Sequence, residues 1–249
     1  MKAARLLVIV VLGSLAAALL AAGSSGSPGP ALVHGPPAFL VGHSQSTNWS
    51  GYSSYSTNGT SFTDVKGSWT QPTATCTKQT AYSSFWVGLD GYHSTSVEQL
   101  GTEADCSHGR PVYYAWWEMY PSPSHTIGDF TVTPGVTYAA EAKYNGNGSF
   151  TLSLSGGGNT PFSTTQTLAN PSLSSAEWIA EAPSLGRVLP LANFGKVSFS
   201  GSSANGQAIN NSAWGYDPLT MVTNGGQVKA APSALDSSGS AFSVTWAHS

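Results

Sequence analysis

The sequence predicts an all-β protein with the architecture of an antiparallel β-sandwich. The 249-residue chain contains many short runs of alternating apolar and polar residues, and turns rich in Gly, Asn and Ser separate these runs. No helical period persists beyond the first residues of the chain, and no alternation of strands with helices indicates a parallel sheet. This combination of short strands and Gly-rich turns is typical of a sandwich.

The first 22 residues predict a secretory signal peptide. Lys2 and Arg5 precede a long apolar run, and small, turn-rich residues follow it. The run is long enough to act as a membrane anchor instead, but no basic stop-transfer segment follows. We expect a signal peptide at 1–22, a linker or short pro-segment rich in Pro, Gly and Ser at 23–46, and one β-sandwich domain at 47–249.

Charged residues are scarce, which limits the classes of partner. They form 8% of the chain, and removal of the leader leaves 7 basic and 12 acidic residues, a net charge near −5. No basic patch for nucleic acid can be built from so few cations. A surface of Ser, Thr, Asn and Gly changes little when carboxylates protonate, which suits an acidic, extracellular setting. After signal removal we expect a secreted protein without stable membrane association, with monomer as the default state.

Cys76 and Cys106 are the only cysteines, and in an exported protein such a pair predicts a disulfide. The six histidines show no metal-ligand spacing, and the Cys106 and His108 pair alone is a poor zinc signal. The sequence therefore predicts no metal and no cofactor.

The central strands place candidate site residues on defined faces. In 81–91, Ser84, Trp86 and Asp90 share one face, while Phe85 and Val87 share the other. The predicted strand 111–121 carries four residues on one face: Tyr114, Trp116, Glu118 and Tyr120. Two runs around "NGNG" in 136–158 predict a hairpin, and 196–201 and 241–246 add further strands.

The segment 174–183 is compatible with two structures. Ser174 and Glu177 form a capping-box pattern that allows a short helix, whereas Trp178 and Ile179 allow a strand equally well. Glu177 and Glu181 share a face in either case, because a spacing of four satisfies both periods.

The motifs of serine, aspartic and zinc peptidases are absent from the sequence. The carboxyl groups are therefore the remaining candidates for catalysis. Glu98, Glu103 and Glu141 alternate with apolar residues and are expected on the solvent face. Glu118 differs because it lies in the aromatic run "YYAWWEMY", where desolvation raises a carboxyl pKa. Glu181 ends the run "EWIAE", where a side chain can be held over a groove.

Four motifs in order give the sequence a family resemblance. "FWVGLDGY", "VEQLGTEADC", "YYAWWEMYP" and "AEWIAEAP" resemble the glutamic peptidases, or eqolisins, and the resemblance extends over about 48–246. Ala182 and Pro183 replace the acidic and aromatic residues frequent in eukaryotic members, so the chain resembles a non-fungal-type, secreted member. The resemblance implies two large antiparallel sheets, as in concanavalin-type lectins, and acid endopeptidase activity on proteins or peptides without a metal.

The resemblance also implies the site residues. Gln99 and Glu181 match the catalytic pair of the family. Glu177 matches a supporting position, and the expected groove residues are Trp86, Asp90, Trp116 and Glu118. Glu181 would then act as the general base that activates water, and the Gln99 amide would donate a hydrogen bond to the oxyanion. An amide suits this role because it remains a donor at every pH and shares no proton with Glu181.

Two other functions remain open at this stage. A glycoside hydrolase on the same sandwich would use paired carboxylates such as Glu118 and Glu181, with Trp86 and Trp116 stacking on sugar rings. A carbohydrate-binding module would need no catalytic residue. Gln99 would be dispensable in the hydrolase, and Glu181→Gln would leave a binding module intact.

Overall fold

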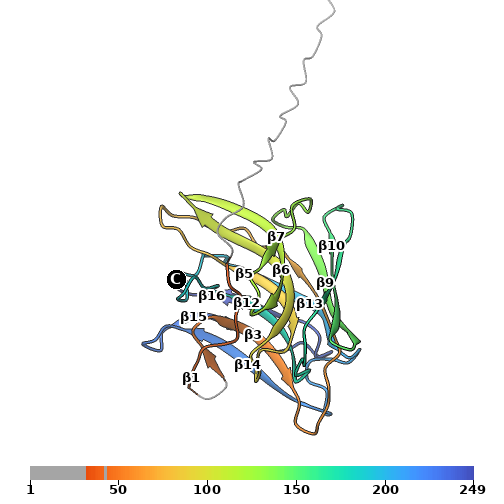
Figure 1. Cartoon of the computed structure of the whole chain (residues 1–249). Coiled ribbons are helices and arrows are strands. Elements are labelled where there is room, and N and C mark those ends of the chain that lie inside the picture. Colours follow the sequence, from red (N-terminus) through yellow and green to blue (C-terminus); the bar gives the residue numbers. More distant parts are fainter. Residues whose placement is uncertain (1–31, 42–43) are drawn as a thin grey trace, which may run out of the picture.

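The computed structural model describes residues 32–41 and 44–249, and the predicted signal peptide lies outside them. The described part contains sixteen strands and no helix, and therefore no helix that could cross a membrane. All but one of the strand pairings are antiparallel, so the predicted all-β class is confirmed (Figure 1).

The strands form two packed layers that share β14. Sheet I has the order β8-β7-β6-β5-β12-β3-β14. Its strands are β3 (Trp49–Tyr55), β5 (Ser84–Leu89), β6 (Val97–Ser107), β7 (Arg110–Tyr120), β8 (His125–Thr126), β12 (Ser175–Glu181) and β14 (Gly215–Val222).

Sheet II continues from β14 in the order β14-β15-β16-β13-β4-β9-β10-β11. Its further strands are β4 (Asp64–Thr70), β9 (Thr137–Gly146), β10 (Ser149–Gly156), β11 (Phe162–Thr167), β13 (Lys196–Ala204), β15 (Val228–Pro232) and β16 (Phe242–Trp246). The short strands β1 (Phe39–Val41) and β2 (Gln45–Ser46) pair with each other, and β2 joins β14.

The main core lies between the two sheets. Apolar side chains of β5, β6 and β12 alternate toward sheet II, as the period of a strand requires. They meet Trp69 and Phe199 of sheet II, and the Trp69 indole donates a hydrogen bond of 2.8 Å to Thr102. Packing against this core holds the strands of sheet I in place, so the side chains on the opposite face of the sheet have fixed directions.

The segment 174–183 forms a strand at its centre. β12 lies between β3 and β5 and pairs with both, and all seven of its residues are buried. Backbone pairing on both edges removes the advantage of a capped helix, since every strand amide and carbonyl already has a partner. Glu177 and Glu181 share a face, as predicted.

The predicted disulfide between Cys76 and Cys106 is confirmed. It ties the loop before β5 to the end of β6, across 30 residues. By closing this loop it stabilises the C-terminal end of β6, which begins near Gln99.

Candidate active site

The predicted pair, Gln99 and Glu181, lies on the face of sheet I that points away from sheet II. Gln99 pairs with Gly88 on β5 and with Glu118 on β7. Glu181 is the last residue of β12 and pairs with Ser84 on β5. Strand alternation therefore brings an amide and several carboxyl groups to one surface, which we call the cleft face.

Two glycines make room on this face for the indole of Trp86. A Cβ on Gly101 would lie 2.3 Å from the carbonyl oxygen of Phe85 and 2.6 Å from the Cβ of Trp86. A Cβ on Gly88 would lie 3.0 Å from both the Cβ of Gln99 and the Trp86 ring. Larger residues at either position would displace the side chains that hold the candidate pair.

Glu181 is fully buried and is held by the neighbouring tryptophan. The Trp86 indole donates a hydrogen bond of 2.9 Å to its Oε2. Burial raises the pKa of Glu181 well above its usual value, while hydrogen bonds from Trp86, Trp49 and Asn48 oppose this rise by favouring the ionised form. Glu181 is thus a carboxyl group whose charge depends on how well the cleft is solvated.

Gln99 is also fully buried and donates two hydrogen bonds through its amide nitrogen. One reaches Glu118 Oε2 at 2.9 Å, and the other reaches the main-chain carbonyl oxygen of His34. Its own Oε1 has no hydrogen-bond partner. The amide therefore presents a donor to a peptide carbonyl, which is the geometry that an oxyanion donor requires.

Glu118 lies beside Gln99 and behaves as the aromatic run predicted. Burial raises the pKa of Glu118 to about 7; the charge of His34 opposes this rise, and the charge of Glu181 adds to it. Gln99 and the amide of His34 both donate to Glu118 Oε2. Glu118 thus orients the Gln99 amide and the peptide that Gln99 touches.

The expectation that Glu98 and Glu103 face solvent is wrong. Both carboxyl groups are fully buried, because β6 is covered on both faces along most of its length. Burial and, after it, the charge of Asp90 raise the pKa of Glu98 to about 9. Burial and then Asp105 raise the pKa of Glu103. Glu103 belongs to the cleft face, where its Oε1 lies 3.4 Å from His34 Nε2.

The remaining expected groove residues divide into two groups. Trp116 stacks on the His34 ring with a centroid distance of 3.7 Å, so it lines the cleft directly. Asp90 instead accepts hydrogen bonds from the backbone amides of Leu173 and Ser174 and anchors the entry to β12. Glu177 lies across Gly88 from Gln99 and accepts a hydrogen bond of 3.1 Å from Ser53.

Three cleft residues escaped the sequence analysis: His34, Asn48 and Trp49. His34 is 1% exposed and contacts Glu118, Glu181, Trp116 and Gln99. Burial lowers its pKa to about 4 despite the opposing charge of Glu118. The motif "NWSGY" could have indicated Asn48 and Trp49, but no local pattern shows that His34 returns to a site 65 residues away.

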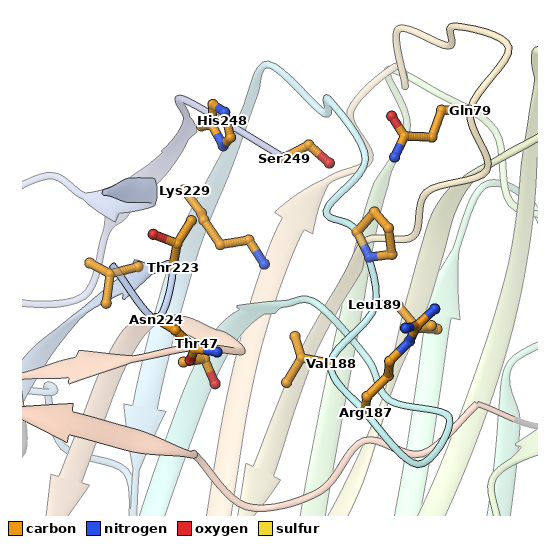
Figure 2. A pocket seen from close by; sticks show the side chains of 12 residues that line it. Thr47, Gln79, Arg187, Val188, Leu189, Thr223, Asn224, Lys229, His248 and Ser249 are labelled. Carbon is orange, nitrogen blue, oxygen red and sulfur yellow. The ribbon is translucent and has the colours of Figure 1, made fainter. Parts of the chain in front are cut away.

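A separate pocket of about 800 Å³ lies away from the predicted pair (Figure 2). Lys229 and Arg187 reach into it from different strands and loops, and burial lowers the pKa of Lys229 to about 8. None of the predicted site residues lines it. Among residues 32–41 and 44–249, no group of three or more His, Cys, Asp and Glu side chains is placed to hold a metal ion.

The fold and the cleft face define a β-sandwich that carries buried amide and carboxyl groups on the outer face of one sheet. A family model described as the Peptidase A4 family matches residues 47–246. The chain therefore belongs to the Peptidase A4 family, and the resemblance to glutamic peptidases is confirmed. It is accordingly an enzyme that hydrolyses peptide bonds.

Solved structures agree with this assignment at the level of the fold. Scytalido-glutamic peptidase with a transition state analog inhibitor is similar at a TM-score of 0.67 and 22% identity, covering 81% of this chain and 98% of that one. SCP-B, an eqolisin in a complex with the tripeptide Ala-Ile-His, has a TM-score of 0.62, 22% identity and the same coverage. Aspergilloglutamic peptidase from Aspergillus niger has a TM-score of 0.59 and 22% identity, covering 67% of this chain and 99% of that one. A search of curated protein sequences gave no match.

Proposed function

We propose that this chain is a secreted acid endopeptidase in which Gln99 and Glu181 form the catalytic pair. One observation carries the proposal: both side chains meet the same peptide residue in the cleft. The Gln99 amide donates to the His34 carbonyl, and Glu181 Oε2 lies 3.3 Å from His34 Nδ1. The leader sequence and the disulfide support export to an oxidising compartment.

The proposed reaction divides the work between the two side chains. Ionised Glu181 takes a proton from a water molecule, and the resulting hydroxide attacks the carbonyl carbon. Gln99 donates its hydrogen bond to the oxygen that becomes negative, and Glu118 keeps the amide turned toward it. Glu181 then returns the proton to the departing amine.

Acid conditions suit this arrangement because the cleft holds three carboxyl groups near one ligand. Glu103, Glu118 and Glu181 all contact His34, and burial favours the neutral form of each. A single negative charge on Glu181, with Glu103 and Glu118 protonated, is the state that the proposed mechanism needs. Low pH protonates Glu103 and Glu118, but burial raises the pKa of Glu181 too, so ionisation of Glu181 depends on the hydrogen bonds from Trp86, Trp49 and Asn48 and on water that enters the cleft when His34 does not cover it.

The cleft accommodates a peptide of a particular composition. The segment that occupies it reads Leu32-Val33-His34, an apolar residue, a β-branched residue and a histidine. SCP-B was solved with Ala-Ile-His, which follows the same order of side-chain types. We infer that this chain also accepts substrates with a histidine next to the cut.

The test is digestion of denatured casein near pH 3–4 by the wild type, Gln99→Ala and Glu181→Gln. We expect losses of about 10²–10³ for the missing oxyanion donor and of about 10²–10⁴ for the missing base. Thermal unfolding of each variant shows whether it is folded. Full activity of Gln99→Ala would leave the amide a structural role, and a wild type that never cuts protein would redirect attention to glycans.

A further inference from the structure

Lys229 on β15 is a buried cation whose ammonium group has no partner in the described part of the chain. Its side chain is 6% exposed, and burial lowers its pKa to about 8. No carboxylate of the described residues forms an ion pair with it, and its ammonium group donates no hydrogen bond to them. Lys66, by contrast, lies 3.3 Å from Asp64 and 3.2 Å from Glu141. Because an unpaired buried cation lowers stability, Lys229 is a candidate for binding an anion from outside the chain.

The side chain of Lys229 points into the pocket of about 800 Å³ that lies away from the predicted pair. Figure 2 shows it extended into the space between Val188 on one side and Thr223 and Asn224 on the other. Sites for small organic molecules have volumes of about 300–1,000 Å³. The pocket is therefore large enough for a ligand bigger than a single inorganic ion.

The charged side chains of this pocket are all basic. Arg187 and His248 line it together with Lys229, and no Asp or Glu of the described residues does. The whole chain has only 9 Lys and Arg residues, so two of them on one pocket concentrate positive charge there. Arginine stays charged at every relevant pH, and a histidine adds positive charge in acid. The pocket therefore attracts anions.

Neutral hydrogen-bond donors complete the polar lining. The Thr223 hydroxyl oxygen accepts a hydrogen bond of 3.1 Å from the amide of Gln227, so its own proton can be donated to a ligand. The side-chain amides of Gln79 and Asn224 line the same pocket. A guanidinium, an ammonium and neutral donors are the groups that bind phosphate, because its oxygens accept several hydrogen bonds at once.

One wall of the pocket is apolar, which indicates a ligand with a carbon skeleton. Val188, Leu189 and Pro190 line the pocket from the loop that follows β12, and Val222 lines it from the end of β14. An inorganic anion would gain nothing from this wall. An organic group that covered it would remove apolar surface from water, which is favourable.

The pocket is separate from the cleft. Ser184 forms one antiparallel bridge with Val33 and another with Val188. Val33 belongs to the segment that covers Gln99 and Glu181, whereas Val188 lines the pocket. The backbone at Ser184 therefore lies between the two sites, and a ligand in the pocket does not take the place of a peptide in the cleft.

We propose that this pocket binds an organic phosphate, whose phosphate group lies against Lys229 and Arg187 and whose carbon skeleton lies against the apolar wall. The bound phosphate supplies the negative charge that Lys229 lacks, so binding stabilises the fold. In acid a phosphate keeps a negative charge, whereas a carboxylate becomes neutral, which favours phosphate in the setting proposed for the enzyme. The inference goes beyond the peptidase activity and uses none of the proposed catalytic residues.

The test is isothermal titration calorimetry of the full-length chain at about pH 5 and constant ionic strength, with phenyl phosphate as the probe. We expect one saturable site that binds phenyl phosphate at least about tenfold more tightly than inorganic phosphate, because only the ester reaches the apolar wall. Lys229→Met should weaken the binding of phenyl phosphate at least about tenfold. Lys143→Met, which changes an exposed lysine on β9 outside the pocket, should bind as the wild type does.

Thermal unfolding shows whether the Lys229 variant is folded and whether the lysine lacks a partner. Lys229→Met removes a buried charge and keeps a side chain of similar length, so without ligand its Tm should be at least that of the wild type. Phenyl phosphate should raise the Tm of the wild type and of Lys143→Met, but not that of Lys229→Met. A lower Tm of Lys229→Met without ligand would mean that the lysine stabilises the fold itself and would overturn the proposal.

Two further results would also overturn it. Equal affinity for phenyl phosphate and inorganic phosphate would leave an adventitious ion only. Equal weakening in Lys229→Met and Lys143→Met would show attraction by net charge and no defined site. None of these measurements uses peptidase activity, so failure of the phosphate site leaves the proposed function standing, and an inactive enzyme leaves the phosphate site testable.

Discussion

The two faces of sheet I are equally buried but chemically opposite. Toward sheet II, β5, β6 and β12 present Phe85, Val87, Leu100 and Trp178. Toward the cleft, the same strands present six other side chains: Ser84, Trp86, Gln99, Glu103, Glu177 and Glu181. Burial on the first face is part of the folded core, whereas burial of Gln99 and Glu181 also depends on segment 32–38.

The two faces contribute to the free energy of folding with opposite signs: the inner face stabilises the fold, and the cleft face lowers its stability. The inner face gains about 25 cal/mol for each Å² of apolar surface removed from water. The cleft face buries carboxyl groups, which is unfavourable unless they are neutral or hydrogen-bonded. Glu103, Glu118, Glu177 and Glu181 on this face, and Glu98 on the opposite face of β6, are therefore tolerated mainly in the neutral form, which their raised pKa values favour.

The largest expected effect is on the pH dependence of stability. Groups with raised folded-state pKa values bind more protons in the folded state than in the unfolded state above about pH 4.5. The free energy of unfolding should therefore be greatest in acid and fall as the pH rises, by about 1.4 kcal/mol per pH unit for each such group. Glu118 and Asp105, with pKa values of about 7, place much of this loss between pH 4.5 and 7.

Thermal unfolding of the Glu181→Gln variant, which lacks the proposed catalytic base, measures how the free energy of unfolding changes with pH. When Glu98→Gln is added to this variant, the free energy of unfolding should fall less steeply up to about pH 9. The substitution removes one carboxyl group with a raised pKa, and that group interacts with Asp90 and not with His34. Stability that rose between pH 4.5 and 7 would show that these carboxyl groups are ionised in the folded protein.

The next prediction compares the stability and activity of variants at two neighbouring residues of β6, one on each face. Leu100→Ala opens a cavity in the core and should lower the free energy of unfolding by about 2–5 kcal/mol, while activity per folded molecule is kept. Gln99→Ala should lower kcat by about 10²–10³ and cost much less stability. Chemical denaturation and casein kinetics on both variants provide the comparison. If Gln99→Ala unfolds as readily as Leu100→Ala, the cleft face is a second core.

The inner face could be predicted from the sequence, and the cleft face only in part. Alternation in 81–91 placed Phe85 and Val87 on one side and Trp86 on the other, and the structure has this arrangement. The same alternation placed Glu98 and Glu103 in solvent, because a period of two separates the faces of a strand without showing what covers them.

The contacts of segment 32–38 could not be predicted for a different reason. Pro36 and Pro37 indicate extended chain, but no periodicity specifies which distant groove an extended segment fills. The partners of His34 lie 65 to 147 residues away, so only the completed sandwich brings them together. The strand at Ser175–Glu181 is a similar case, since its pairing with β3 and β5 decided between two locally acceptable structures.

The smallest effect concerns how the cleft face tunes its own base. Trp86→Phe keeps an aromatic ring but removes the indole N–H that bonds to Glu181 at 2.9 Å. Because this bond favours the ionised carboxylate, its loss raises the pKa of Glu181, and the acid limb of the kcat/KM profile should move to higher pH. Trp116→Phe removes a comparable indole donor, but one directed at Ser84, so it should weaken peptide binding and leave that limb in place. An equal shift in both variants would mean that the limb reports a general loosening of the cleft and not the charge of Glu181.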